Sequence, residues 1–557
     1  MQLLGVEAGT HAGQPSASTS PALRQPQPQP QLNDGRRRSH ERTLAAGSLG
    51  RVQAEPVQAN ATPGEITVDS VRGRGVLATT VLASGMVFLD GTIANVAARQ
   101  IGVDFSSSFA TLQWVLNGYT LALASLLLLG GSLGDHFGRR RVYLIGIGWF
   151  AIASLGCAFA PTAGLLIAAR VLQGIGGALL TPGSLALIQS TFRPADRGRA
   201  VGIWSGMAAV ATAAGPLLGG YLVQHVSWRL AFGINVPFAV AAIGLGLRYL
   251  PESRSAGAGR RLDLAGTGLI ALSLGALTYG TTVAGDRGWG ALSIGVTAAG
   301  VVLLGLFVLL ESRLLHPLLP LRLFADRTFA GANLMTFTTY AAMSAVLFLF
   351  VLNLQVSAHY GALAAGLATL PITVLLLVVS PRAGALAARL GPRLPMALGP
   401  LITAAGVLLT MRIDERHSGY LLDVLPGIAV FGLGIACLVA PLTSTVMNAA
   451  PANDVGVASA VNNAVSRLAG LLAIAVLPPL AGLTGDRYRV PADMTHGYRI
   501  AGSLCVGILI LGSLVVTLTV PNTRQRPNDA SDDASDEVSE DDSDVTRRGA
   551  ADSHPDP

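Results

Sequence analysis

Long apolar stretches separated by short polar segments follow one another along most of this chain. About fourteen of them have the roughly 18–25 residues that a helix needs to cross a hydrocarbon layer about 30 Å thick. Their approximate centres lie at residues 87, 123, 151, 176, 211, 239, 273, 301, 340, 374, 402, 432, 472 and 509. Because irregular backbone cannot face lipid, this pattern predicts an all-α polytopic membrane protein with 14 transmembrane helices.

Both ends of the chain lack the apolar pattern. Residues 1–72 contain the repeat QPQPQPQ, and residues 522–557 are acidic and rich in serine. Segments of this composition cannot bury enough apolar surface to fold, so both are predicted to be disordered tails.

A weak internal repeat predicts two related halves. GSLGDHFGRR in the second span and GALAARLGPR in the tenth share glycine, leucine and arginine at the same offsets. The repeat predicts two six-helix halves, residues 73–252 and 316–521, with two inserted helices in residues 253–315. Paired halves with a site between them are typical of transporters.

The charge content and its distribution support membrane insertion. Only 13% of the 557 residues are charged, about half the share expected of a soluble protein. All 38 basic residues are arginine, about 28 on the side of the termini and about 8 on the other. The positive-inside rule therefore predicts a multi-pass protein of the cell (inner or plasma) membrane with both tails in the cytoplasm.

Two opposite charges lie inside apolar spans. Asp90 interrupts GMVFLDGTIANVA in the first span, and Arg170 interrupts the fourth. Charge at such depth costs roughly 2.5–3.5 kcal/mol, so each residue needs a partner or water and is a functional candidate. We hypothesise that Asp90 alternates between a proton and a charge partner such as Arg170; a static pair that only holds helices together is the alternative.

The stretch GGSLGDHFGRRRVYLIG (residues 130–146) combines glycines, one carboxylate and three arginines at a short turn. Glycines allow close helix packing and a tight turn, and an anion at a helix end needs a cationic partner. The pattern favours a gating loop that latches one half of the protein against the other, rather than a simple positive anchor. Its candidate residues are Gly131, Asp135, Gly138, Arg139, Arg140 and Arg141.

This loop resembles the signature loop of the major facilitator superfamily, although His136 stands where the family usually has a basic residue. LIAARVLQGIGGALLTP (residues 166–182) resembles the fourth-span motif of that superfamily, and AAGPLLGG (residues 213–220) resembles its fifth-span antiporter motif. LDGTIANVA, WVLNGYTLALA and WRLAFGINVPFA resemble its fourteen-span drug:proton antiporter branch (EmrB/QacA type).

The resemblance covers about residues 76–520 and implies a major facilitator fold that works by alternating access. It also implies proton-coupled efflux of drugs or other amphipathic small molecules, with Asp90 and Arg170 in proton coupling. The antiporter motif supplies Gly215, Pro216, Gly219 and Gly220, which would form a smooth, kinked helix face between the halves.

Further polar residues are possible contacts of a substrate within the spans. They are Asn117, Tyr119, Gln173, Asn463 and Arg467. Interfacial anchoring or ordinary helix–helix hydrogen bonding is the alternative for each of them.

No catalytic pattern accompanies these features. The chain lacks lysine and therefore a Walker loop, and it has no metal-ligand spacing and no nucleophile elbow. We expect no enzymatic activity, no metal and no cofactor, with transport driven by the proton gradient. The expected partners are small molecules, protons and the lipid bilayer, not nucleic acid, and we expect a monomer. A proton-coupled importer and a non-transporting sensor or scaffold are the alternatives.

Overall fold

The computed structural model of the protein describes residues 66–254, 263–314, 317, 319–451 and 454–522. In this part of the chain, 14 helical segments are long and apolar enough to cross a membrane. Apart from one isolated bridge, the regular structure found there is helical. The predicted all-α fold with 14 spans is confirmed.

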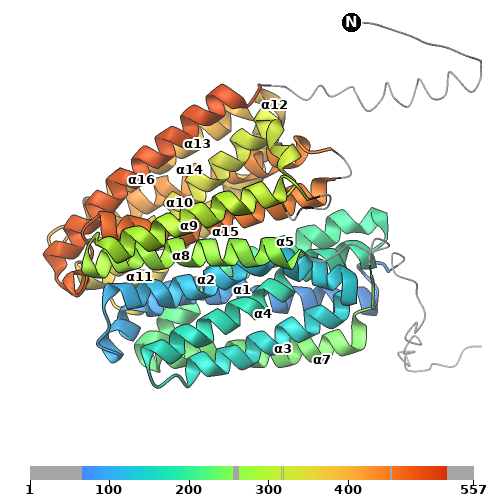
Figure 1. Cartoon of the computed structure of the whole chain (residues 1–557), viewed down its shortest axis with the longest axis horizontal. Coiled ribbons are helices and arrows are strands. Elements are labelled where there is room, and N and C mark those ends of the chain that lie inside the picture. The colour runs from blue at the N-terminus through green and yellow to red at the C-terminus, as the bar shows by residue number, and fades with distance from the viewer. Residues whose placement is uncertain (1–65, 255–262, 315–316, 318, 452–453, 523–557) are drawn as a thin grey trace, which may run out of the picture. The chain divides into compact units, whose positions relative to one another are not determined.

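The spans fall into two groups of six with two helices between them (Figure 1). The first six are α1 (Val71–Asp104), α2 (Phe109–Phe137), α3 (Arg139–Ala158), α4 (Ala163–Thr191), α5 (Pro194–His225), and α6 (Trp228–Gly233) with α7 (Asn235–Tyr249). The next two are α8 (Leu264–Arg287) and α9 (Ala291–Glu311). After the 3-10 turn η1 (Leu321–Ala325), the last six are α10 (Arg327–Val356), α11 (Ala362–Leu367) with α12 (Leu370–Leu390), α13 (Arg393–Thr410), the π-helical turn η2 (Tyr420–Val424) with α14 (Leu425–Asn448), α15 (Val455–Leu480) and, after the turn η4 (Arg487–Arg489), α16 (Pro491–Thr519).

Residues 66–72 were predicted to belong to the disordered tail, but in the structure they are ordered. Ile66 forms a parallel bridge with Phe192, and the backbone N–H of Val68 donates to Asp196 at 3.2 Å. Ile66 and Val68 are both 4% exposed and belong to the core of the first half. Burial of these two apolar side chains fixes the segment that leads into α1. The rest of both predicted tails lies outside the described residues.

Side-chain caps fix where several spans begin. Ser70, Thr162, Asp263 and Asp326 each accept a hydrogen bond from the backbone N–H three residues further along, at the starts of α1, α4, α8 and α10. Such caps satisfy donors that the helix itself leaves unpaired. They set the register of each span and thus the depth of its polar residues.

The helix bundle has two ends that differ in packing. We call the end with the α2–α3 turn the Gly138 end, and the end with the α15–α16 connection the Tyr488 end. At the Tyr488 end, one hydrophobic core contains residues of both halves, including Phe109 and Phe348. At the Gly138 end, each half has its own core in the described residues. The halves are therefore joined at the Tyr488 end and separate at the Gly138 end.

Hydrogen bonds reinforce the joined end. Gln113 Nε2, Gln355 Nε2 and Tyr488 Oη each donate to a backbone carbonyl of the opposite half, at 2.5, 3.2 and 2.9 Å. The acceptors are Ile474 in α15, Val96 in α1 and Ser107 in the connection between α1 and α2. These bonds hold the two halves in contact where their common core lies.

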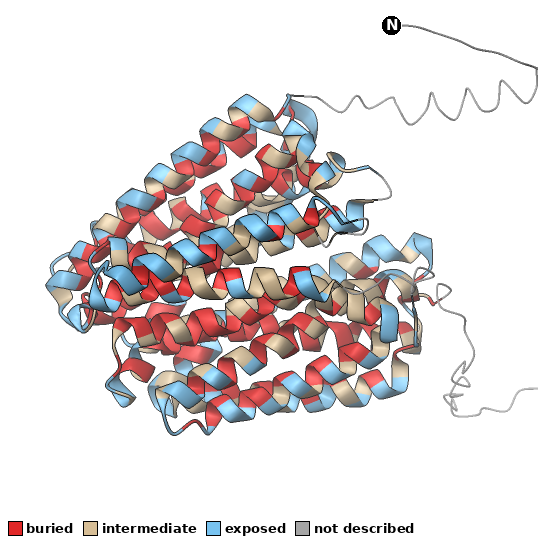
Figure 2. Cartoon of the chain, viewed as in Figure 1, coloured by how far each residue is buried: buried red, intermediate tan, exposed pale blue. Residues whose placement is uncertain are grey.

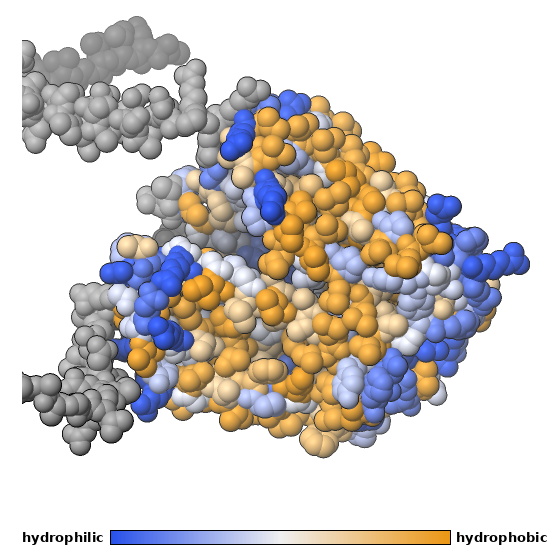
Figure 3. Space-filling view, turned by 180° about the vertical axis from the view of Figure 1, so that it is seen from behind, coloured by the Kyte–Doolittle hydropathy of each residue, from blue (hydrophilic) through white to orange (hydrophobic). Residues whose placement is uncertain are grey.

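The outer surface is apolar along the helices and polar at both ends. Ile152, Leu272, Val302 and Leu518 are 70%, 65%, 62% and 76% exposed. Buried positions face the bundle interior in Figure 2, and Figure 3 shows a broad apolar band between polar ends. Such a band matches the hydrocarbon layer of a bilayer, so the chain is a multi-pass membrane protein.

Candidate functional site

A closed polar network surrounds Asp90 in α1. Its Oδ2 accepts a hydrogen bond from Arg170 Nη1 at 2.5 Å, and its Oδ1 accepts from Gln173 Nε2 at 2.9 Å and Asn235 Nδ2 at 3.3 Å. The side chains of Arg170 and Asp90 are 1% and 0% exposed. The structure thus brings together the two intramembrane charges singled out in the sequence. Both carboxylate oxygens are satisfied by donors from α4 and α7.

Arg170 is held by more than its counter-ion. Its Nε donates to the carbonyl of Val115 at 3.0 Å, and its Nη1 also donates to Gln173 Oε1 at 2.6 Å. The guanidinium lies over the rings of Tyr119 and Phe232, 4.4 and 5.4 Å from their centroids. Desolvated cation–π contacts of this kind are favourable. Arg170 therefore keeps neutral partners in place if Asp90 loses its charge.

Two members of the network were not among the residues singled out in the sequence. Ser154 Oγ accepts from Gln173 Nε2 at 2.8 Å and from Asn235 Nδ2 at 3.4 Å. Asn235 begins α7 directly after the break at Ile234 that separates it from α6. Asn235 is the lone polar residue in the apolar stretch GINVPFA, so the sequence offered a reason to select it. Ser154 lies among small residues, and its sequence context offered no such reason.

Electrostatics make this network sensitive to protonation. Removing one partner of a buried ion pair typically costs about 3–5 kcal/mol, because the other charge stays buried without compensation. A proton on Asp90 has the same effect on Arg170. Protonation of Asp90 should therefore favour any conformation that gives Arg170 water or a new acceptor.

The predicted gating loop forms a tight, ionic turn. Gly138 has φ 108°, which favours glycine, and a Cβ there would lie 2.7 Å from Glu252 Oε1. Asp135 pairs with Arg139 at 2.7 Å, which supplies the cation that an acid at a helix end needs. The backbone N–H of Arg140 donates to Glu252 at 3.1 Å. The turn is therefore tied to the segment that follows α7.

The loop makes no latch to the second half in this conformation. Among the described residues, every hydrogen bond and ion pair formed by residues 131–141 stays within the first half. Gly131 packs against α4, where a Cβ would lie 3.6 Å from Pro182, and Arg141 is exposed. Because the halves are separate at the Gly138 end, the gating role stays a prediction for a conformation in which that end closes.

The glycines of the antiporter motif face two neighbours of α5. A Cβ on Gly215 would collide with α1, and one on Gly219 would lie 2.9 Å from Ile93 of that helix. On the other side, a Cβ on Gly220 would lie 2.7 Å from the Cα of Leu363 in α11, which also packs against the carbonyl of Pro216. The motif thus lets backbone meet backbone where the halves touch.

Comparison with known proteins places this arrangement in a family. The model of the Major Facilitator Superfamily matches residues 80–474, more than half of the chain. The chain belongs to this superfamily. The predicted membership and the predicted major facilitator fold are confirmed, and members of the superfamily are transporters of small molecules.

Several named relatives are similar over most of their length. The chain is 37% identical to the tetracenomycin C resistance and export protein of Streptomyces glaucescens, over 75% of this chain and 78% of that protein. It is 34% identical to the puromycin resistance protein pur8 of Streptomyces alboniger, over 84% and 95%. It is 36% identical to the multidrug resistance protein Stp of Mycobacterium tuberculosis (strain CDC 1551 / Oshkosh), over 72% and 74%.

Solved structures of other superfamily transporters share the fold. An auto-inhibited POT family peptide transporter aligns with TM-score 0.60 and 15% identity, over 82% of this chain and 98% of that one. A D-xylose–proton symporter aligns with TM-score 0.57 and 16% identity, over 81% and 99%. At these identities the likeness establishes the fold alone.

The five residues singled out as substrate contacts do not form one group. Gln173 belongs to the Asp90 network, and Asn463 is exposed and donates to a carbonyl of its own helix. Asn117 is fully buried, and within the described residues neither polar atom of its side chain has a partner; the same holds for the hydroxyl of Tyr119. Arg467 is half-buried in α15 and forms no hydrogen bond or ion pair with any described residue. Of the last three, Arg467 is accessible to a ligand, whereas the polar atoms of Asn117 and Tyr119 are enclosed by the protein.

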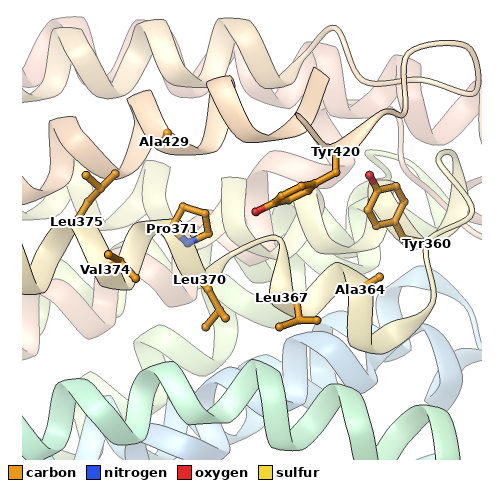
Figure 4. A pocket seen from close by; sticks show the side chains of 9 residues that line it. All are labelled: Tyr360, Ala364, Leu367, Leu370, Pro371, Val374, Leu375, Tyr420 and Ala429. Atoms are coloured by element: carbon orange, nitrogen blue, oxygen red, sulfur yellow. The ribbon is translucent and has the colours of Figure 1, made fainter. Parts of the chain in front are cut away.

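A separate apolar pocket of about 720 Å³ lies in the second half, near the Tyr488 end (Figure 4). Residues of α11, α12, α14 and the loops before α11 and α14 line it: Tyr360, Ala364, Leu367, Leu370, Pro371, Val374, Leu375, Tyr420 and Ala429. It contains none of the charged residues of the spans. We therefore centre the candidate site of this superfamily member on the Asp90 network and Arg467 instead.

Proposed function

We propose that this chain is a proton-coupled antiporter that exports drugs or other amphipathic small molecules from the cell. The names of its relatives in Streptomyces and Mycobacterium, which speak of resistance and export, support the substrate class and the direction. The observation that carries the coupling is the buried pair of Asp90 and Arg170, a carboxylate whose charge state matters to the protein around it. Both fit the drug:proton antiporter branch that the sequence resembles.

The excess of arginine at the Gly138 end supports a cytoplasmic location for that end and for both tails. The separate cores at the Gly138 end then correspond to an inward-facing conformation. Substrate would enter between the halves from the cytoplasm or the inner leaflet. Closure of the Gly138 end, with the loop at residues 131–141 as its gate, would accompany opening of the Tyr488 end.

Proton binding at Asp90 couples this exchange to the membrane potential. In the outward-facing state, water reaching the network would let Asp90 take up a proton while Arg170 keeps its bonds to Val115 and Gln173. In the inward-facing state, formation of the ion pair would release the proton to the cytoplasm. One proton crossing about 100 mV supplies about 2.3 kcal/mol, enough for a substrate gradient of roughly 50-fold without any cofactor.

Dye flux in proteoliposomes with an imposed pH gradient tests this proposal. Native protein should accumulate an amphipathic dye only while the gradient exists, and a proton ionophore should abolish the accumulation. Asp90→Asn should be folded but unable to accumulate dye. Symport of the dye with protons would favour an importer instead, and absence of flux for every dye would favour a sensor or scaffold.

A further inference from the structure

Arg467 is a half-buried cation without a counter-charge. It lies near the middle of α15 (Val455–Leu480), far from the polar ends of the bundle. Within the described residues, it donates no hydrogen bond and forms no ion pair. An arginine at such depth normally faces a wet space or a partner, because its charge is costly in hydrocarbon.

The register of α2 and α15 places Arg467 between the halves. Gln113 of α2 donates to the carbonyls of Ile474 and Ala475, so these two antiparallel helices touch there. Each residue advances a helix by 1.5 Å, so the second turn of α2 beyond Gln113 lies level with Arg467. Arg467 precedes Ile474 by seven residues, about two turns, and therefore lies on the same face of α15 as the contact with Gln113. Arg467 therefore points toward the first half and not toward lipid.

An amide without a partner faces this position from α2. Asn117 lies one turn beyond Gln113 on the same face of α2, fully buried, with both side-chain polar atoms unpaired. Buried polar atoms in proteins are normally satisfied by protein, water or ligand. A guanidinium and an amide on facing helices together offer donors to an anionic oxygen.

The carboxylate of Asp90 is already paired. Asp90 has its charge balanced by Arg170 and its remaining oxygen bonded to Gln173 and Asn235. The centre of the protein thus holds one acid and two arginines, and Arg467 is the surplus charge. A cationic substrate would find no free carboxylate here, whereas an anion would find a free guanidinium.

We propose that Arg467 binds the acidic group of the exported compound, and that the preferred substrates are amphipathic organic anions with a carboxylate, phenolate or enolate oxygen. This inference rests on the proposed export function and specifies its substrate class. Asn117 on the facing helix donates a further hydrogen bond to the same oxygens. Charge-assisted bonds from arginine are stronger than neutral ones, so Arg467 supplies the main discrimination.

Two dyes with the same tricyclic ring system but opposite charge provide the test. Fluorescein is an anion and rhodamine 6G a cation, and their binding to protein in lipid nanodiscs is measured by fluorescence anisotropy. Native protein should bind fluorescein more tightly than rhodamine 6G. Arg467→Gln should weaken fluorescein binding by about tenfold to a hundredfold and leave rhodamine 6G binding unchanged or tighter. Arg467→Lys should retain part of the preference.

Arg382→Gln is the matched control, because Arg382 is exposed on α12 and donates to a carbonyl of its own helix. Thermal unfolding shows whether each variant is folded. If Arg467→Gln is not folded, the dye affinities of Arg467→Lys and of native protein decide whether the anion site exists. Equal fluorescein affinity in native protein and Arg467→Gln, or a native preference for rhodamine 6G, would overturn the anion site. Gradient-driven flux in proteoliposomes is measured separately. If fluorescein binding depends on Arg467 but no gradient-driven flux is found, proton-coupled export is refuted and the anion site stands.

Discussion

Neutralising both members of the buried ion pair separates a proton-carrying role of Asp90 from a structural one. Asp90→Asn leaves the guanidinium of Arg170 buried without a counter-charge, and Arg170→Gln leaves the carboxylate in the same condition. Both side chains are essentially inaccessible, at 0% and 1% exposure, so water cannot compensate. Each single substitution should therefore destabilise the protein by about 3–5 kcal/mol.

The double variant Asp90→Asn/Arg170→Gln should be more stable than the sum of the single effects implies. It buries no unpaired charge, and it loses mainly the bonds from Arg170 to Val115 and to Gln173. Two hydrogen bonds of this kind contribute about 1–3 kcal/mol in total. The two substitutions should thus be coupled by at least about 3 kcal/mol, at the upper end of the range found for residues in direct contact.

Thermal unfolding in detergent and dye flux in proteoliposomes measure the two consequences on the same preparations. The double variant should unfold at a higher temperature than either single variant. It should equilibrate dye down a concentration gradient but fail to accumulate it under a pH gradient. Gradient-driven accumulation by the double variant would refute Asp90 as the proton carrier. The pair would then serve only to hold helices together. Additive destabilisation would refute the argument from the buried charge.

Two further predictions concern the glycine face of α5 and the contact between Asp69 and Arg199. Gly220→Ala should slow gradient-driven flux several-fold, since a Cβ there would lie 2.7 Å from the backbone of α11 in the other half. Gly206→Ala on the same helix, where a Cβ meets nothing within 4 Å, should match native flux; equal rates in both variants would contradict a role for this contact. The hydrogen bond from Arg199 lowers the pKa of Asp69 below 3.8, so this contact stabilises the folded state above that pH and is lost as the pH falls through the lower pKa. Asp69→Asn should therefore lower the unfolding temperature at pH 6 but not in strong acid, and a difference independent of pH would contradict this origin.

The spans were predictable because the bilayer imposes a length and an apolar composition that few other structures need. The order of Ile66 and Val68 was not, since these are two isolated apolar residues in a polar segment. Two apolar residues give no periodicity, and their burial depends on a distant partner, Phe192. Local pattern therefore located the helices and missed a contact made across the fold.

The same distinction applies within the polar network. Asp90 and Arg170 stood out because charge in an apolar run is costly and therefore rare. Ser154 and Asn235 are neutral, and small neutral residues in membrane helices cost little, so their role became visible only when the helices were placed together. The orientation of Arg467 toward the first half likewise depends on helix packing and not on the sequence of α15 alone.

The neutral hydrogen bonds at the joined end of the protein contribute little to keeping it closed. Arg489 donates across the halves to the carbonyls of Gly102 and Ser107, and no ion pair between described residues crosses the halves there. The neutral side chains of Gln113, Gln355 and Tyr488 also bridge the halves by donating to backbone carbonyls. When the end opens, water replaces each of these bonds, so each contributes only about 0.5–1.5 kcal/mol. A proton moving through about 100 mV supplies about 2.3 kcal/mol, comparable to two or three such bonds. The pair of Asp90 and Arg170 lies inside one half, so opening of this seam leaves both charges buried, and protonation of Asp90 is what breaks the pair.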